Sequence, residues 1–231
     1  MKMYKVVNIV LLLVIVLIGG SCTNGTSKLE KALKEIDNNS YTVECLKEIE
    51  FAQTYTPEIY TYEIDIYFEK DDIQLYMSTI SDDVESYVYM LKTEKTKKVF
   101  TKKQASSKWE ELKGFELAAY ENEFDKMYTI SAVGKFVEKD GEWVGDVELL
   151  KPYVKEYIDE FADDLRKNEG KIKRADLTKY NIILDGRHIS EIKIDILIEL
   201  IFDGFTSIVT NEMTFKFSNI GKTKVTKPYI I

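Results

Sequence analysis

Apolar and polar residues alternate with a period of two along several stretches of this chain, which predicts β-strands with one buried face. An early example covers residues 60–68, and its apolar parity comprises Tyr60, Tyr62, Ile64, Ile66 and Phe68. The same period returns over residues 73–77 after a polar turn, and further short strands are predicted over 84–91 and 96–101. Successive short strands joined by tight polar turns predict an antiparallel meander.

The last third of the chain returns to the same period, with charged or polar residues between the apolar ones. Its main apolar positions are Ile192, Ile194, Ile196, Met213, Phe215 and Phe217. Asp-Gly pairs at 140–141, 185–186 and 203–204 predict tight turns, because this dipeptide suits the left-handed backbone of short hairpins. The sequence therefore predicts a second group of antiparallel strands.

Two stretches have helical spacing instead. Ser27 and Glu30 form a capping box, and apolar residues at positions 29, 32, 33 and 36 predict a short amphipathic helix that ends near residue 38. Pro152 predicts the start of a second helix, with an apolar stripe that runs from Val154 to Leu165. Residues 106–112 fit either a helix start or the end of a hairpin, and residues 117–128 have helical spacing with many aromatic side chains.

The amino-terminal residues have the composition of an export signal. Lys2 and Lys5 precede thirteen residues, 6–18, that are apolar except for Asn8. That length suits the apolar region of a signal peptide and falls short of the about 20 residues that a membrane-spanning helix needs. Small residues follow, and residues 23–27 are polar, as a flexible tether requires.

The sequence Gly19-Gly20-Ser21-Cys22 resembles the lipobox of bacterial lipoproteins, in which a diacylglycerol is attached to the cysteine and cleavage follows just before it. The resemblance implies a signal peptide over 1–21, a lipidated tether over 22–27, and an exported protein anchored through Cys22 to the outer face of the bacterial cell membrane. Gly19 departs from the leucine that is usual at its position. An ordinary signal peptide with an incidental cysteine and an uncleaved anchor are the alternatives.

Composition narrows the classes of partner. The chain has 231 residues and a net charge of −8, and an acidic surface repels the phosphates of nucleic acids and of anionic membranes. Cys45 is the only cysteine besides Cys22, and we expect it to be a small buried side chain in a strand. Without an internal repeat or a long linker, residues 28–231 are predicted to form one domain.

The sequence shows no constellation that predicts catalysis. A catalytic triad or a zinc site would have to use His188, the only histidine, which follows a predicted hairpin turn and is expected to be exposed. Acidic residues occur as sequence neighbours that diverge on a strand or helix. We therefore expect no enzymatic activity, no metal and no cofactor. A hydrolase built from carboxylates that the fold brings together is the least favoured hypothesis.

The order of these elements resembles the LolA-like and LppX-like half-barrel lipoprotein families. The local matches are Ser106–Trp109, the hairpin Leu184–Asp195 and the ending Phe217–Pro228. The resemblance implies an α+β fold in which a strongly curved antiparallel sheet, a half-barrel, covers a few helices. Members of these families carry lipid or lipopeptide cargo between the sheet and the helices.

The apolar parity of the predicted strands would line the concave face of such a half-barrel. We name these eleven residues the concave set: Tyr60, Tyr62, Ile64, Ile66, Phe68, Ile192, Ile194, Ile196, Met213, Phe215 and Phe217. Alternation alone does not distinguish a ligand-binding face from a dry core. One functional hypothesis is an envelope lipoprotein that binds a lipid or another apolar ligand here. The alternative is a non-enzymatic module for protein–protein interaction or adhesion at the cell envelope.

Overall fold

The computed structural model describes most of the chain downstream of residue 25. The described residues are 26–52, 57–69, 72–81, 84–93, 96–105, 107–113, 135–152, 154–155, 158–159, 162, 171–202 and 205–225. The predicted signal peptide, Cys22 and the helical spacing over 117–128 lie outside these ranges.

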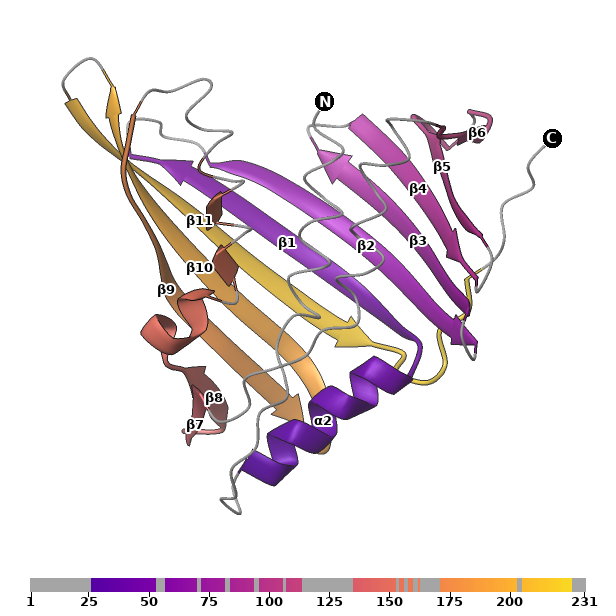
Figure 1. The fold of residues 1–231 in the computed structure, drawn as a ribbon, viewed down its shortest axis with the longest axis horizontal. Helices are drawn as coiled ribbons and strands as arrows, with labels where there is room; N and C mark the ends of the chain where they lie inside the picture. Colours follow the sequence, from indigo (N-terminus) through magenta and orange to yellow (C-terminus); the bar gives the residue numbers. More distant parts are fainter. Residues whose placement is uncertain are drawn as a thin grey trace.

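The described residues form a large open antiparallel sheet of eleven strands, which confirms the predicted sheet (Figure 1). The strands are β1 Tyr41–Phe51, β2 Glu58–Glu69, β3 Asp72–Ser81, β4 Val84–Lys92, β5 Lys97–Lys102, β6 Glu110–Glu111, β7 Phe136–Lys139, β8 Glu142–Gly145, β9 Lys171–Asp185, β10 His188–Phe202 and β11 Phe205–Ser218. Helix α2 covers Thr26–Asn38, and further helical residues occur at 147–152, 154–155, 158–159 and 162. The described part of the chain is thus mostly strand, with two helical stretches.

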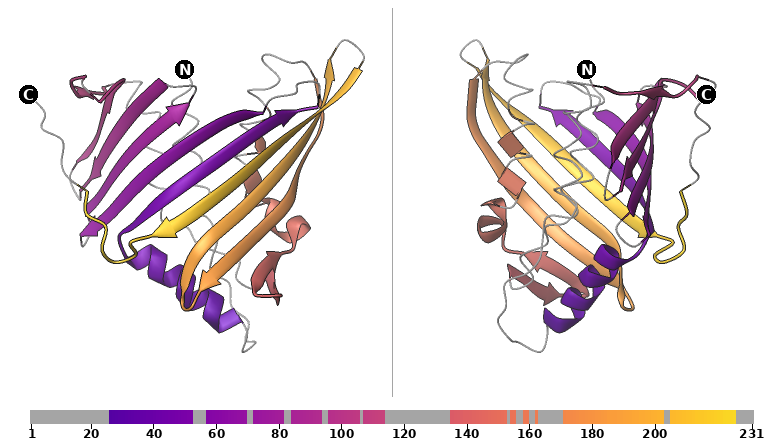
Figure 2. Two further views of the ribbon diagram at one scale, coloured as in Figure 1. Left: turned by 180° about the vertical axis from the view of Figure 1, so that it is seen from behind. Right: turned by 45° about the vertical axis from the view of Figure 1, so that its right-hand side comes forward.

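The strand order is β6-β5-β4-β3-β2-β1-β11-β10-β9-β8-β7, so two meanders meet where β1 pairs with β11. At this seam Val43 lies opposite Phe217 and Cys45 lies opposite Phe215. The sheet curves into a trough, and α2 crosses one end of its strands (Figure 2). None of the described helices is long and apolar enough to cross a membrane.

Irregular pairing between β9 and β10 contributes to the curvature. The register shifts at three places along this pair, and one shift leaves Thr178 without a partner residue on β10. The Thr178 hydroxyl donates a hydrogen bond of 3.0 Å to the carbonyl oxygen of Asp195. An extra residue in one strand bends that strand and increases its twist. These shifts therefore contribute to the bend of the sheet at β9 and β10.

Helix α2 confirms the first predicted helix. Its predicted apolar side chains are all buried: Leu29, Ala32, Leu33 and Ile36. The helix begins at Thr26, so Ser27 lies in its first turn rather than before it. The apolar stripe faces the sheet, and α2 contacts β10.

The predicted start of the second helix at Pro152 is wrong, because the helix begins at residue 147. Asp146 caps it: its Oδ1 accepts hydrogen bonds of 3.1 Å from the backbone N–H groups of Glu148 and Leu149. Pro152 lies five residues further on and removes a helical hydrogen bond instead of opening the helix. The predicted inward positions Val154 and Ile158 are buried.

The predicted turns at 140–141 and 185–186 are confirmed, and the predicted turn at 203–204 lies outside the described residues. Asp140 and Gly141 have φ angles of 50° and 87°, the left-handed values of a tight β7–β8 hairpin. Gly186 has a φ of 61° in the β9–β10 hairpin. Of the two alternatives for residues 106–112, the hairpin is right, because Glu110 and Glu111 pair with β5 as strand β6.

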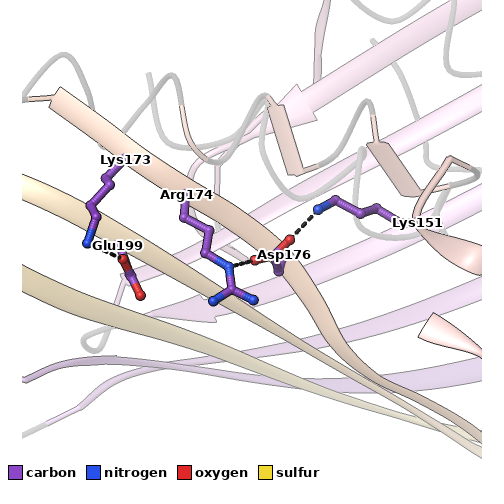
Figure 3. A network of polar contacts seen from close by, with 5 residues as sticks. All are labelled: Lys151, Lys173, Arg174, Asp176 and Glu199. Atoms are coloured by element: carbon purple, nitrogen blue, oxygen red, sulfur yellow. Dashed lines mark hydrogen bonds and ion pairs between the residues drawn. The ribbon is translucent and has the colours of Figure 1, made fainter. Parts of the chain in front are cut away.

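A polar joint ties the second helical stretch to β9 (Figure 3). The Asp176 carboxylate accepts hydrogen bonds from the Lys151 ammonium and the Arg174 guanidinium. Beside it, the Lys173 Nζ lies 3.1 Å from Glu199 Oε2. The hydrogen bond from Lys151, reinforced by Arg174, holds the pKa of Asp176 below its usual value.

Replacing Asp176 with asparagine is expected to lower the free energy of unfolding by about 1 kcal/mol, because the exposed partners Lys151 and Arg174 are screened by water. A carboxyl group whose pKa is lowered on folding stabilises the fold above its unfolded pKa of about 3.9. The difference between the wild type and Asp176→Asn should therefore be full at neutral pH and vanish as the pH falls through the lowered pKa. Urea denaturation at several pH values measures it. A difference between the two proteins that stays the same from neutral to strongly acidic pH would contradict this explanation.

Candidate ligand-binding face

The strand register brings the predicted concave set to one face of the sheet. Phe215 lies opposite Cys45 on one side and Ile192 on the other, and Met213 lies opposite Ile194. Cys45 in turn lies opposite Tyr62. Residues directly opposite each other in a sheet project to the same face, so these positions form a continuous apolar surface across the seam.

Eight members of the concave set are buried: Tyr62, Ile64, Ile66, Ile192, Ile194, Ile196, Met213 and Phe215. Tyr60 and Phe217 are partly buried and pack against the same core. The structure describes the backbone of Phe68 in β2 but not the position of its side chain. Side chains of α2 and of the second helical stretch belong to this core as well. Ten of the eleven side chains of the concave set therefore lie in, or pack against, one apolar core. Their binding of a ligand stays a prediction.

Aromatic side chains contribute to this face near the seam. The rings of Tyr60 and Tyr62 are stacked, with centroids 6.4 Å apart and an interplanar angle of 5°. Tyr41 and Phe217 meet across β1 and β11 with their centroids 5.7 Å apart. Large aromatic side chains bury much apolar area, and a tyrosine adds a hydroxyl for a polar partner.

Two polar side chains lie among the apolar ones, and the sequence prediction missed both. Lys47 of β1 is 4% exposed and Asn211 of β11 is fully buried. Lys47 shares the inward parity of Cys45 and Ile49, and Asn211 shares that of Val209 and Met213. A lysine and an asparagine at inward positions of otherwise apolar strands were the signal that could have found them.

Lys47 and Asn211 are diagonal neighbours across the seam. Lys47 lies opposite Met213, and Ile49, two residues along the same strand, lies opposite Asn211. Diagonal pairs in a sheet have Cα atoms about 7–8 Å apart, which is within reach of a long side chain. On its other side Lys47 lies opposite Tyr60, and its Nζ is 6.0 Å from the centroid of that ring.

Cys45 lies beside this pair and is buried, which confirms the sequence prediction. Burial raises the pKa of its thiol far above the usual value, and the positive charge of Lys47 offsets only part of the rise. The thiol therefore stays protonated, and a protonated thiol is a poor nucleophile.

The residues weighed for catalysis lie away from this face. His188 is at the start of β10 with its side chain 40% exposed, and its Nδ1 lies 2.7 Å from Glu35 Oε2 on α2. It thus joins the β9–β10 hairpin to the helix. Glu110 and Glu111 are exposed in β6. Within the described ranges, no group of three or more histidine, cysteine and acidic side chains is placed to hold a metal ion.

Two solved structures are similar to this chain at low sequence identity. The chain matches no protein-family model and, by sequence, no curated protein. A solved DUF1329 family protein from Desulfovibrio piger is similar at 10% identity and a TM-score of 0.31, over 88% of this chain and 93% of that one. A domain described as an outer membrane lipoprotein-sorting protein, from Vibrio parahaemolyticus, is similar at 8% identity and a TM-score of 0.29, over 88% and 93% of the two chains.

Proposed function

We propose that this protein is a non-enzymatic lipoprotein of the bacterial cell envelope that binds a lipid or another apolar ligand on the concave face of its sheet. Cys22 would carry the membrane anchor, and the concave set would contact the ligand. No nucleic acid, metal or cofactor takes part in this proposal.

The extent of the apolar face is the observation that supports the proposal. Eleven antiparallel strands about 4.8 Å apart make a sheet about 48 Å wide. Apart from Lys47 and Asn211, the inward side chains named above are apolar from β2 across the seam to β9. Helix α2 has thirteen residues and is therefore about 20 Å long. A face of this width offers room for acyl chains when the side chains that cover it are exchanged for ligand.

A second observation favours the alternative, an envelope module for protein–protein interaction. The end of the β10–β11 hairpin projects beyond the neighbouring strands (Figure 1). Three large apolar side chains near this end are exposed. Phe205 is 72% exposed, Ile208 is 40% exposed and Ile201 is 38% exposed. By the strand register, Ile201 and Ile208 project from one face of the hairpin and Phe205 projects from the other, so an apolar contact site on one face would be built on Ile201 and Ile208.

Native mass spectrometry separates the two candidates. Residues 27–231 would be purified without the anchor, so that any lipid recovered by organic extraction comes from the fold itself. We expect an apolar adduct near one copy per chain that disappears when the same sample is denatured. A mass that stays free of adducts after incubation with membrane lipids would overturn the ligand-binding proposal and favour the interaction module.

A further inference from the structure

We propose that the outer face of helix α2 lies on the headgroups of an anionic membrane, so that the α2 end of the sheet faces the membrane and the β10–β11 hairpin points away from it. We name three exposed residues of this helix the basic face: Lys28, Lys31 and Lys34. This inference rests on the anchor at Cys22 in the proposed function, and it adds the surface by which the folded domain contacts the lipids. The partner is the layer of phosphate groups of anionic lipids.

The chain between the proposed anchor and α2 is short. Helix α2 begins at Thr26, four residues after Cys22. Four residues of fully extended chain span at most about 14 Å. A lipid on Cys22 holds this cysteine at the membrane surface, so the first turn of α2 lies within about 14 Å of that surface. The anchor therefore keeps the start of α2 close to the lipid headgroups.

The two faces of α2 have different surroundings. Its apolar side chains, at positions 29, 32, 33 and 36, are buried in the core and are not available for insertion into a bilayer. The three lysines of the basic face follow one another at a spacing of three residues, which places them together on the outer side of the helix. Lysine side chains suit the headgroup region, because the aliphatic stem contacts apolar surface while the ammonium group meets phosphate.

The acidic side chains Glu30 and Glu35 of α2 form ion pairs within the fold. Glu30 Oε1 lies 2.5 Å from Lys34 Nζ. Glu35 lies between two groups of the β9–β10 hairpin, 3.9 Å from Arg187 Nε and 2.7 Å from His188 Nδ1. The other two lysines of the basic face form no ion pair with another described residue. Their positive charges therefore face solvent in the first two turns after the tether.

Part of the acidic charge of the chain lies in a row on the convex face instead. Glu48, Glu212 and Asp195 lie directly opposite one another on β1, β11 and β10. They have the parity opposite to that of the inward residues of these strands, so they project from the convex side. Like charges directly opposite repel one another, and anionic lipids would add to that repulsion. The charges of the two surfaces therefore favour α2 over the convex face as the membrane contact.

The length of β10 separates the other end of the fold from the membrane. This strand begins at His188, beside α2, and ends at Phe202. Fifteen residues at about 3.3 Å each make a strand about 50 Å long. Both views in Figure 2 show α2 and the β10–β11 hairpin at opposite ends of the long strands. In this orientation Ile201 and Ile208 face away from the membrane that holds the anchor.

Lysine footprinting on vesicles tests this orientation with the full lipidated chain. The protein would be bound to vesicles of phosphatidylglycerol or of phosphatidylcholine and treated briefly with an amine-acetylating reagent that does not cross the bilayer. Mass spectrometry would then measure the acetylation of each lysine. An anionic leaflet attracts one nearby lysine by a factor of about five, so we expect Lys28 and Lys31 to react about fivefold more slowly on phosphatidylglycerol. The difference should disappear in about 1 M salt, which screens these charges.

Lysines at the other end of the fold provide the matched control. Lys103 and Lys108 are exposed and lie between β5 and β6, and Figure 1 shows β6 at the end of the sheet away from α2. Their acetylation should be the same on both kinds of vesicle. The double variant Lys28→Gln/Lys31→Gln should weaken the protection of Lys34 on phosphatidylglycerol, whereas Lys103→Gln/Lys108→Gln should leave it unchanged. All four substitutions are at exposed positions, so circular dichroism should show the wild-type fold in both variants.

The outcomes separate this inference from the function on which it rests. A lipid on Cys22 together with equal acetylation of the basic face on both kinds of vesicle would overturn the orientation and leave the lipoprotein intact. Protection of Lys103 and Lys108 in place of the basic face would also overturn it, because the domain would then be inverted. An unmodified Cys22 in the purified chain would overturn the anchor and this inference together.

Discussion

The variant Phe215→Ala is expected to lose about 3–5 kcal/mol of the free energy of unfolding. Phe215 is fully buried, and it lies at the seam between Cys45 of β1 and Ile192 of β10. Removal of its ring would leave a cavity where the two meanders meet, and the paired strands on both sides limit how far that cavity can collapse. Urea denaturation followed by circular dichroism measures the loss.

Phe205→Ala is the control for this experiment. The same ring is removed, but Phe205 is 72% exposed at the end of the β10–β11 hairpin. The free energy of unfolding should change by no more than about 0.5 kcal/mol. If the two variants lost similar stability, the concave face would be loosely packed at the seam, contrary to the burial seen there.

Gly145→Ala is expected to cost about 2–3 kcal/mol, because the site has no room for a methyl group. A Cβ atom at Gly145 would lie 2.3 Å from Leu150 Cδ1 and 2.7 Å from the carbonyl oxygen of Tyr180. The leucine side chain can move, but the carbonyl belongs to the backbone of β9 and is fixed by pairing with β10. The midpoint of thermal unfolding should fall, and a free energy close to that of the wild type would contradict this geometry.

Gly141 provides a comparison within the same β7–β8 hairpin. A Cβ atom there would meet nothing within 4 Å, but the φ angle of 87° is unfavourable for any side chain. Gly141→Ala should therefore cost only about 1 kcal/mol. The two glycines separate the cost of a steric clash from the cost of backbone strain.

The period-two pattern predicted most strands correctly, because hairpin turns and alternation are local signals. The seam was not predictable in this way. Strands β1 and β11 lie near opposite ends of the described chain, and no turn sequence specifies their pairing. Only the burial of one shared apolar face selects the register, since a slip by one residue would turn that face outward.

Strand β9 shows a different limit. The tight turn predicted at 185–186 locates only the end of this strand, whereas the strand extends over Lys171–Asp185. The register shifts near Thr178 and Lys173 interrupt its alternation, so that its inward residues no longer share one parity. A bulge therefore removes the period-two alternation by which a strand is predicted from its sequence.

The candidate site was predictable in its apolar part and missed in its polar part. Alternation identified the concave set, whose members share a face because the strands are in register. Lys47 and Asn211 follow the same parity, but a pattern of apolar residues does not include them. A polar residue at an inward position of a strand is informative because the tertiary fold buries it. The residue type alone does not show this burial.

The two edge strands of the described sheet affect whether copies of this protein can pair strand to strand. An open sheet has two free edges, and such edges can pair with another chain and start aggregation. Among the described strands, the outermost are β6, with two residues, and β7, with four. Glu110 and Glu111 form one edge strand, and exposed Glu138 and Lys139 lie on the other. The described edge strands are therefore short and charged, and both features disfavour the addition of a strand from a second copy of the protein.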